Sequence, residues 1–528
     1  MKPYSATRVG SLDLGAVFAV GAAENPATRI ILDHDLALYP EAGRILTMAK
    51  AAGLVEDLAG RLKAAGVTAG SYVAICATHR FDIILAACAA GRVGGVPVML
   101  AADSDGPTVD ALLAKLDRTA YLVTDAEKLT YDLAEVPLAS RVAGVLSLAG
   151  DHPGAVTLAD TVPLAGPFAK PRSANAPALV THSSGTTGLP KLIVQSGRSL
   201  YWHFHPQYRR ARYLRLTGTL ATVTSFAHVR IWPMLMIAAR IGQDLAFLTN
   251  PDPARAADLF LQTRPEIVEA FPNVMLRWEG MADDPREPLA NVRLFRSTFD
   301  AMHPRTILRM MDASRRRLPI YGQGYGQSEV GGAISFLGTK GMVSRLGTRC
   351  VGRPLFGVTK MRIERPAGAD PRTPGKIWVR SRGRAIGIIG EQQQYQERFR
   401  DGWWDMGDVG YQGRFGALYL LDRVVDRIDG VDSTLSLEDT LMTRLPELVE
   451  VVVVPAEEGR ATPVVCTQKD EPLDRVRWKE AVRDLGDLAE PLQVRWEDLP
   501  VTSTWKIRRP LLRRKLAEGT LPVLEPRS

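Results

Sequence analysis

The chain has 528 residues, too many for one compact core, so its length predicts two or more domains. Hydrophobic residues make up 46% and charged residues 23% of the chain, as in an ordinary globular protein, and no apolar stretch is long enough to make it an integral membrane protein. The formal net charge of +8 comes from dispersed basic residues that no aromatic-interleaved motif accompanies, which argues against a nucleic-acid partner.

The four cysteines lie far apart, without the spacing of metal ligands. They are Cys76, Cys88, Cys350 and Cys466. We interpret them as buried thiols in a reducing compartment. The sequence shows no basic start followed by an apolar run and a cleavage site, so it predicts a cytoplasmic protein.

Strands and helices alternate through the first half of the chain. Short apolar runs at 72–76 and 96–100 predict buried strands, and the apolar stretch 81–95 between them predicts a helix stopped by glycines. Further strands are predicted at 118–125, 220–226, 244–248 and 266–271. This order is typical of parallel βαβ units and therefore predicts an α/β fold.

Near residue 360 the pattern changes to short strands separated by glycine and proline turns, at 358–368, 375–383 and 416–428. After about Ile428 a helix at 437–445 and a strand at 449–455 precede another helix and a basic tail. We therefore place a domain boundary close to residues 422–426.

The stretch 180–196, VTHSSGTTGLPKLIVQS, places a glycine-rich turn after a predicted strand. Such a turn can present several backbone N–H groups to one anion, and Gly185 and Gly188 let a phosphate come close. Hydroxyl and ammonium donors are added by Ser183, Ser184, Thr186, Thr187 and Lys191. The segment is not a Walker P-loop, because GTTGLPK lacks the four-residue gap and the Ser or Thr after the lysine. It predicts a polyphosphate site, with an ordinary surface turn as the alternative.

Four further motifs follow in order. YGQGYGQSE at 321–329 ends a predicted strand with a hydroxyl and a carboxylate, and DGWWDMGDVG at 401–410 places Asp408 in a predicted glycine turn. LDRVVDRI at 421–428 and the segment 499–514, which carries Lys506, come next. From about residue 30 to 520 the five motifs together resemble the adenylate-forming superfamily of acyl-CoA synthetases, peptide-synthetase adenylation domains and luciferases.

The resemblance implies the fold in more detail. It is an α/β fold with a large N-terminal domain, residues 1–424, made of layered βαβ subdomains plus a small β-barrel-like part. A small, mobile α+β C-terminal domain, residues 425–528, would carry Lys506. Homodimers are common in this superfamily, so a homodimer is a further expectation.

The resemblance also implies the chemistry. Such enzymes use ATP to convert an oxyacid into a mixed anhydride with AMP, releasing pyrophosphate. The loop 181–191 would cradle the β- and γ-phosphates, Ser328 would touch the α-phosphate, and Glu329 would bind Mg²⁺, since a hard carboxylate suits a hard cation. Asp408 would accept the ribose hydroxyls with help from Arg423, and Lys506 would stabilise charge in the transition state.

The remaining site residues follow from the same resemblance. Tyr325, Gly326 and Gln327 would line the nucleotide, and Gly324, His228 and Asp300 would lie near the acid. Each has a plainer alternative: Asp408 could be a turn aspartate, Lys506 a surface base, and His228 a packing or capping histidine.

Three departures from the family pattern concern the second half-reaction. Val425 stands at the usual polar hinge position, Asp432 at a glycine beside the pantetheine path, and Trp505 at the glycine before the closing lysine. A side chain with negative charge at position 432 would oppose a phosphorylated thiol donor. A shifted alignment with the family would make Gly430 the functional glycine, and this is a simpler explanation for Asp432 taken alone.

These departures predict an enzyme that forms an adenylate without passing it to CoA. The most specific form of this hypothesis is an ATP-dependent diazotase, which activates nitrite and transfers the nitrosyl group to an aromatic amine. Its partners would then be a small acid and an acceptor amine. The alternatives are an acyl- or aryl-CoA ligase, or a ligase loading a carrier protein, and a non-catalytic protein of the same fold.

Overall fold

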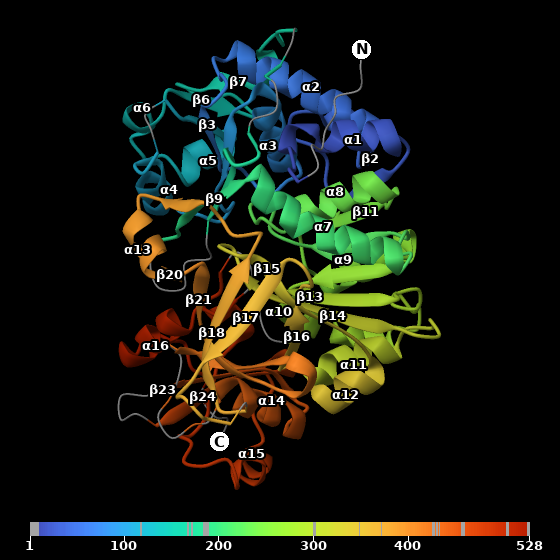
Figure 1. The fold of residues 1–528 in the computed structure, drawn as a ribbon, viewed down its shortest axis with the longest axis vertical. Helices are drawn as coiled ribbons and strands as arrows, with labels where there is room; N and C mark the ends of the chain where they lie inside the picture. Colours follow the sequence, from blue (N-terminus) through green and yellow to red (C-terminus); the bar gives the residue numbers. More distant parts are fainter. Residues whose placement is uncertain are drawn as a thin grey trace. The chain divides into compact units, whose positions relative to one another are not determined.

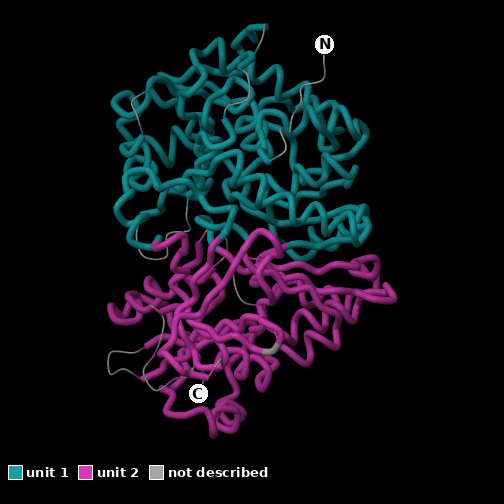
Figure 2. Tube along the Cα trace, in the orientation of Figure 1, with its two compact units in different colours: residues 1–269, 327–332, 381–399 teal, residues 270–326, 333–380, 400–528 magenta. Residues whose placement is uncertain are grey.

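The computed structural model describes residues 10–116, 119–165, 168–169, 173–182, 189–298, 302–347, 349–370, 372–424, 428, 431, 433–455, 460–502 and 506–524. The chain divides into two compact units (Figure 2). Unit 1 comprises Met1–Glu269, Gln327–Gly332 and Ser381–Phe399, and unit 2 comprises Ala270–Gly326, Ala333–Arg380 and Arg400–Ser528. Among the described residues, no helix has the length and apolar character needed to cross a membrane.

The first sheet of unit 1 has the strand order β19-β9-β8-β4-β3-β5-β6-β7. The pairs from β8 to β7 are parallel, whereas β9 and β19 add antiparallel strands at one edge. The strands are β3 (Tyr72–Ile75), β4 (Val96–Met99), β5 (Tyr121–Thr124), β6 (Gly144–Ser147), β7 (Val156–Thr157), β8 (Pro177–His182), β9 (Leu192–Ser196) and β19 (Gly387–Ile389).

Helix α3 (Asp82–Val93) connects β3 to β4 and is buried along almost its whole length. It packs against α2 (Met48–Ala64) and β4, and it ends at Gly94, whose φ of +91° suits glycine. Helix α4 (Gly106–Leu113) connects β4 to β5, and α5 (Ala126–Tyr131) and α6 (Leu138–Arg141) lie between β5 and β6 in the chain (Figure 1). The predicted strand–helix–strand order is confirmed, and it positions the β8–β9 connection.

A second group of strands in unit 1 runs in the order β12-β10-β11-β1-β2. They are β1 (Arg29–Leu32), β2 (Ile45–Thr47), β10 (Leu220–Val223), β11 (Leu245–Leu248) and β12 (Ile267–Ala270), and only β2 is antiparallel to its neighbour. The helices are α1 (Val17–Glu24), α7 (Gly197–Tyr213), α8 (Ile231–Ile241) and α9 (Pro253–Thr263). Helices α7 and α8 lie side by side (Figure 1).

Unit 2 contains strands in the order β13-β14-β15-β16-β22-β21-β18-β17. They are β13 (Leu294–Thr298), β14 (Ile320–Gln327), β15 (Gly331–Thr339), β16 (Cys350–Pro354), β17 (Thr359–Glu364), β18 (Gly375–Ser381), β21 (Trp403–Gln412) and β22 (Leu418–Arg423), with β20 (Phe399–Arg400) paired to β21. Its helices before residue 400 are α10 (Pro272–Arg277), α11 (Pro304–Asp312) and α12 (Lys340–Leu346).

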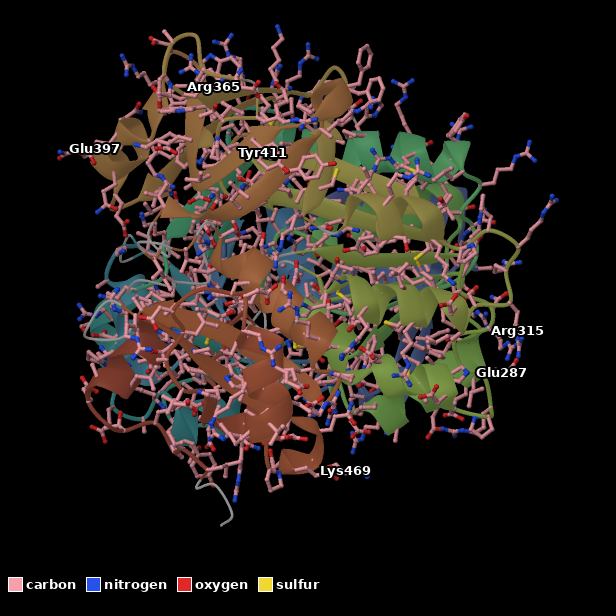
Figure 3. The ribbon with its side chains drawn as sticks, turned by 90° about the horizontal axis from the view of Figure 1, so that it is seen from below. Glu287, Arg315, Arg365, Glu397, Tyr411 and Lys469 are labelled. Carbon is pink, nitrogen blue, oxygen red and sulfur yellow. The ribbon has the colours of Figure 1, made fainter. Side chains whose placement is uncertain are left out.

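The part of unit 2 from β16 to β18 corresponds to the expected barrel-like part. Its strands pair antiparallel. Tyr411 of β21, which is labelled in Figure 3, stacks on Tyr419 of β22 with ring centroids 5.0 Å apart. The strand path ends at β17 without returning to β16 among the described residues, so this part is an open sheet and no closed barrel forms there.

The C-terminal part of unit 2 has its own three-stranded sheet, ordered β23-β24-β25. Its elements are α14 (Thr434–Arg444), β23 (Leu448–Pro455), β24 (Ala461–Thr467), α15 (Arg475–Val482), β25 (Leu492–Gln493) and α16 (Arg509–Ala517). Helices α14 and α15 pack on one apolar cluster and α16 on a second. The predicted helix at 437–445 and strand at 449–455 are confirmed.

The basic cluster at 315–317 lies on the surface of unit 2. Arg315 forms an ion pair with Glu287 (Figure 3), and Arg316 donates a hydrogen bond to the carbonyl of Asn291. The cluster is therefore a solvated face whose charge is partly balanced by its own neighbours.

Candidate active site

The glycine-rich segment connects the antiparallel strands β8 and β9, whose ends are paired through His182 and Leu192. Six predicted phosphate-binding residues lie outside the described residues: Ser183, Ser184, Gly185, Thr186, Thr187 and Gly188. Lys191, at the end of the loop, donates to Oε1 of Gln394 at 3.0 Å, and its Nζ lies 3.6 Å from Oε2 of Glu391. A phosphate held by this loop would meet a lysine whose side chain is already oriented.

Helix α13 (Gln392–Glu397) orients that lysine. Glu391, which precedes the helix, also pairs with Lys115 at 2.7 Å, so one carboxylate lies between two ammonium groups. These contacts are all inside unit 1. Glu391 therefore holds both ammonium groups, Lys115 and Lys191, on the same side of α13.

Ser328 and Glu329 follow β14 in a turn that backbone contacts hold in place. The amide of Gln195 donates to the Ser328 carbonyl at 2.7 Å, and the Ala385 N–H donates to the Glu329 carbonyl at 2.7 Å. Glu329 is buried with 7% exposure. Burial raises the pKa of Tyr395 on α13, and the Glu329 carboxylate adds to that rise, which places the two groups near each other. Lys191 thus contacts α13, and the Glu329 charge acts on Tyr395 of the same helix.

The side chains around Glu329 suit a Mg²⁺ ion that is shared with the substrate better than a metal ion held by protein ligands alone. Among the described residues, no group of three or more His, Cys, Asp or Glu side chains could hold a metal ion. Mg²⁺ is commonly held by one or two carboxylates together with substrate phosphates and water. The buried carboxylate of Glu329 is compatible with that mode of binding.

Asp408 lies in strand β21, so the prediction of a tight turn at this position was wrong. Gly407 has a φ of +70°, and the pairing of β21 with β18 is irregular at this place. The glycine therefore produces a bulge inside a strand, which the sequence pattern alone does not distinguish from a turn. The irregular strand directs the Asp408 side chain toward Tyr325.

Inside unit 2, Asp408 joins two other predicted residues. The Tyr325 hydroxyl donates to Oδ2 of Asp408 at 2.6 Å, and Nε of Arg423 lies 4.0 Å from Oδ1. Burial, followed by the Asp408 charge, holds the pKa of Tyr325 well above its ordinary value, so the phenol remains a donor. One carboxylate oxygen is therefore fixed by Tyr325, and an arginine faces the other.

The motif around 321–327 also contains a polar chain that sequence reasoning missed. Tyr321 donates to Oε1 of Gln323 at 3.1 Å, and the Ser297 hydroxyl lies 2.5 Å from the Tyr321 oxygen. All three side chains are buried. The alternation of Tyr and Gln with glycine at 321–326 was the available signal, because alternate residues of a strand share a face. Gly324 pairs with Thr298 at the same strand ends.

His228 lies in the loop between β10 and α8. The backbone N–H of Arg230 donates to its Nδ1 at 3.1 Å. Every residue from 220 to 239 is described, and all of these except His228 are buried. A further predicted pocket residue, Asp300, lies outside the described residues, as do Val425, Asp432 and Trp505.

Lys506 lies between two backbone contacts in the C-terminal part. The Thr502 N–H donates to the Lys506 carbonyl at 2.9 Å, and the Lys506 N–H donates to the Thr502 hydroxyl at 3.2 Å. Val501 and Ile507 form a bridge around them. Arg509 then donates to the carbonyl of Val453 and to Glu438, which fixes α16 on β23 and α14. Lys506 is thus carried by a well-anchored backbone.

Comparison with known proteins assigns the family. The AMP-binding enzyme family matches residues 18–388, and the chain belongs to that family. It is an adenylate-forming ligase.

Two curated relatives are diazotases. The chain is 41% identical over 535 residues to the 3-amino-2-hydroxy-4-methoxybenzoate diazotase of Streptomyces cremeus, with 96% of each chain covered. It is 27% identical over 297 residues to the 3-aminoavenalumate diazotase of a Streptomyces species, with 53% of this chain and 52% of the relative covered. The fold is similar to that of an amide bond synthetase from Marinactinospora thermotolerans, with a TM-score of 0.77, 22% identity, and 95% and 99% of the two chains covered.

Proposed function

We propose that this enzyme activates nitrite with ATP and transfers the nitrosyl group to an aromatic amine. The observation that carries the proposal is the 41% identity to a diazotase over 96% of both chains. The replacements at Val425, Asp432 and Trp505 point the same way, because they affect the hinge, the glycine beside the pantetheine path and the glycine before the closing lysine in thioester-forming relatives.

The proposed reaction has two steps. A nitrite oxygen attacks the α-phosphorus of ATP, a new P–O bond forms, and the bond to pyrophosphate breaks. The amine nitrogen then attacks the nitrosyl nitrogen, the N–O bond breaks, and AMP leaves with an oxygen that came from nitrite. The two amine hydrogens then leave with the nitrosyl oxygen as water, which gives the diazonium product. The Streptomyces relatives suggest an amino-hydroxybenzoate or aminocinnamate type of acceptor in secondary metabolism.

The nucleotide would be held by residues from several motifs. The loop 181–191 with Lys191 would bind the β- and γ-phosphates, and Ser328 would contact the α-phosphate. Mg²⁺ bound to Glu329 would supply charge neutralisation at the phosphates. Tyr325, Gly326 and Gln327 would line the nucleotide.

The ribose and the transferred group would meet other residues. Asp408, oriented by Tyr325 at 2.6 Å, would accept the ribose hydroxyls beside Arg423. Lys506 would stabilise the charge that develops as the α-phosphate is attacked. We further propose that residues 1–424 and 425–528 are the two functional domains, the second carrying Lys506.

AMP release from ATP tests the proposal. The enzyme is assayed with nitrite and an aminohydroxybenzoate, with each omitted in turn, and with fatty acids or aryl carboxylates in place of nitrite, all with and without CoA. The expected signal requires nitrite and is the same with and without CoA. A signal that requires a carboxylate and CoA would instead establish an acyl- or aryl-CoA ligase.

A further inference from the structure

The turn at residues 327–332, which carries Ser328 and Glu329, is held in unit 1 by other parts of that unit. Three successive carbonyl groups of this turn each accept a hydrogen bond from a segment that is distant in the chain. The donors are Nε2 of Gln195 to Ser328 at 2.7 Å, the Ala385 N–H to Glu329 at 2.7 Å, and the Ser381 hydroxyl to Val330 at 3.0 Å. The path of the 327–332 turn is therefore determined by residues outside it.

Gln195 of β9 is buried, and its amide has a defined orientation. Because a carbonyl oxygen can only accept, the NH₂ of the amide faces Ser328 and Oε1 faces away from it. The Ser199 hydroxyl donates to this Oε1 at 2.8 Å. Ser199 also forms the capping box with Ser196 at the start of α7. The residues that begin this helix therefore also orient Gln195.

His203 lies four residues beyond Ser199 on α7 and supports the 327–332 turn by a second route. Its Nε2 lies 2.7 Å from the Gly383 carbonyl, and because this oxygen can only accept, Nε2 carries the proton. Burial lowers the pKa of His203 to about 4, so the ring donates this hydrogen bond without a buried charge. The Gly383 N–H in turn donates at 3.0 Å to the Ser381 hydroxyl, which is the donor to the turn.

The imidazole ring of His203 also packs directly against two glycines. Gly331, in the 327–332 turn, has a φ of +73°, which favours glycine. A Cβ atom at Gly383 would lie 2.7 Å from Cδ2 of His203, and one at Gly331 would lie closer still to the ring. Neither position has room for a side chain beside this ring. His203 therefore fills the space between the turn and the segment that contains Gly383.

Both supports come from one face of α7, because residues four positions apart lie on the same side of a helix. Ser199 acts through Gln195 on the Ser328 carbonyl, and His203 acts through Gly383. Helix α7 itself packs on α8 within unit 1. Groups that are held in place before a ligand arrives bind it more tightly, because less ordering accompanies binding.

We propose that Gln195 and His203 are positioning residues for Ser328 and Glu329. They hold the 327–332 turn in one conformation, so the Ser328 hydroxyl and the Glu329 carboxylate need no ordering when ATP and Mg²⁺ bind. This inference rests on the proposed function, which assigns Ser328 to the α-phosphate and Glu329 to Mg²⁺.

Hydrogen–deuterium exchange of the enzyme without ATP or Mg²⁺ tests whether these residues hold the turn. Gln195→Met removes the donor to Ser328 at nearly constant side-chain length. We expect exchange about tenfold faster than in the wild type in peptides that contain Val330 and Ala385, whose N–H groups bond to the carbonyls of Gln327 and Glu329. Wild-type exchange rates in these peptides would overturn the proposal.

The matched control is Gln243→Met. Gln243 is also buried in unit 1, and its Nε2 donates to the carbonyls of Leu216 and Gly218 at 3.1 Å and 3.0 Å. This variant loses buried hydrogen bonds of the same kind, so its urea midpoint should fall about as far as that of Gln195→Met. Exchange in the peptides of Val330 and Ala385 should remain that of the wild type.

The Mg²⁺ dependence of ATP–pyrophosphate exchange tests what the positioning contributes. In Gln195→Met the half-saturating Mg²⁺ concentration should rise about fivefold, while KM for the acid changes less than about twofold. Gln243→Met should leave both values unchanged. A merely structural role of Gln195 would lower the urea midpoint without changing the Mg²⁺ dependence, and that result would overturn the proposal.

Two variants of His203 test its hydrogen bond. His203→Leu fills the space without a donor and should raise the half-saturating Mg²⁺ concentration about fivefold. His203→Gln keeps a side-chain N–H for the Gly383 carbonyl and should stay within about twofold of the wild type. Equal values for the Leu and Gln variants would overturn the positioning role of His203.

Glu329→Gln distinguishes a failure of this inference from a failure of the proposed function. The kinetic experiments use whichever acid supports exchange by the wild-type enzyme. If Glu329→Gln has the wild-type Mg²⁺ dependence, the assignment of Glu329 to Mg²⁺ in the proposed function is wrong. The deuterium exchange of Gln195→Met still decides whether Gln195 holds the 327–332 turn, because it requires neither ATP nor Mg²⁺.

Discussion

Tyr325 and Asp408 form the most closely defined part of the candidate nucleotide site. The Tyr325 hydroxyl is 2.6 Å from a carboxylate that is 6% exposed. Tyr325→Phe should leave Asp408 charged but less well oriented. We expect KM for ATP to rise about fivefold to tenfold with a small change in kcat, as a hydrogen bond to a charged group implies. ATP–pyrophosphate exchange measures this, with Tyr411→Phe in strand β21 as the control. An unchanged KM for ATP would contradict the assignment of Asp408.

Lys506 is expected to act mainly in the transition state. Lys506→Ala should reduce adenylation by about 10²-fold or more, while the Kd for ATP changes little, because the lost charge stabilises developing negative charge. Exchange kinetics and ATP titration measure the two effects separately. Lys479→Ala, an exposed lysine on α15, is the control. Normal turnover of the Lys506 variant would disprove its catalytic role.

At the scale of single residues, the sequence predicted which residues lie together better than it predicted their backbone conformation. Tyr325, Asp408 and Arg423 were all expected near the nucleotide, and unit 2 brings them together. The turn predicted at Asp408 is a strand with a bulge, because Gly407 signals positive φ without showing which structure uses it. The hydrogen bond of His203 with Gly383 could not be predicted, since it joins residues that are far apart in the chain.

Helix α14 is docked by a cluster of charged groups in unit 2. His303, which precedes α11, has Nδ1 2.9 Å from Asp439 of α14 and Nε2 3.8 Å from Glu450 of β23. Arg349 lies 2.8 Å from the other oxygen of Asp439. Burial lowers the pKa of His303, but its contacts with Asp439 and then Glu450 outweigh this and raise it to about 9. His303 is therefore charged at physiological pH and binds α14 to the rest of unit 2.

The raised pKa of His303 predicts a pH-dependent stability. The folded-state pKa lies above the ordinary value, so the contribution of His303 is fully present below about pH 6.5 and is lost as pH rises through about 9. The free energy of unfolding should fall over this range by up to roughly 3 kcal/mol more in the wild type than in His303→Gln. Urea unfolding at several pH values measures the difference, and parallel pH profiles for the two proteins would contradict the ion pair.

At the scale of elements, periodicity was sufficient for the repeated strand–helix–strand units. Helix α3 and strands β3 and β4 lie within their predicted ranges, because the apolar runs mark the elements and Gly94 and Gly95 separate the helix from β4. Contacts across long separations were not predictable. Asp422 on β22, for example, accepts hydrogen bonds from the hydroxyl and the backbone N–H of Thr434 at the start of α14, which no local pattern indicates.

For the whole molecule, the order of five motifs along the chain was more informative than any single motif. A glycine-rich turn or a lysine near the end of a chain is common. The order of all five motifs along one chain, however, predicted the AMP-binding family that residues 18–388 match. The acid and the acceptor could not be derived in this way. They depend on the shape and polarity of the pocket that binds them, which no single motif determines.

The fate of a nitrite oxygen tests the central claim most directly. The enzyme is incubated with ATP, an aminohydroxybenzoate and nitrite labelled with oxygen-18, and AMP and pyrophosphate are analysed by mass spectrometry. Attack of nitrite on the α-phosphorus, followed by cleavage of the N–O bond, predicts AMP that carries one labelled oxygen and pyrophosphate that carries none. Unlabelled AMP formed together with the diazo product would show that nitrite is never joined to AMP, and would contradict the account.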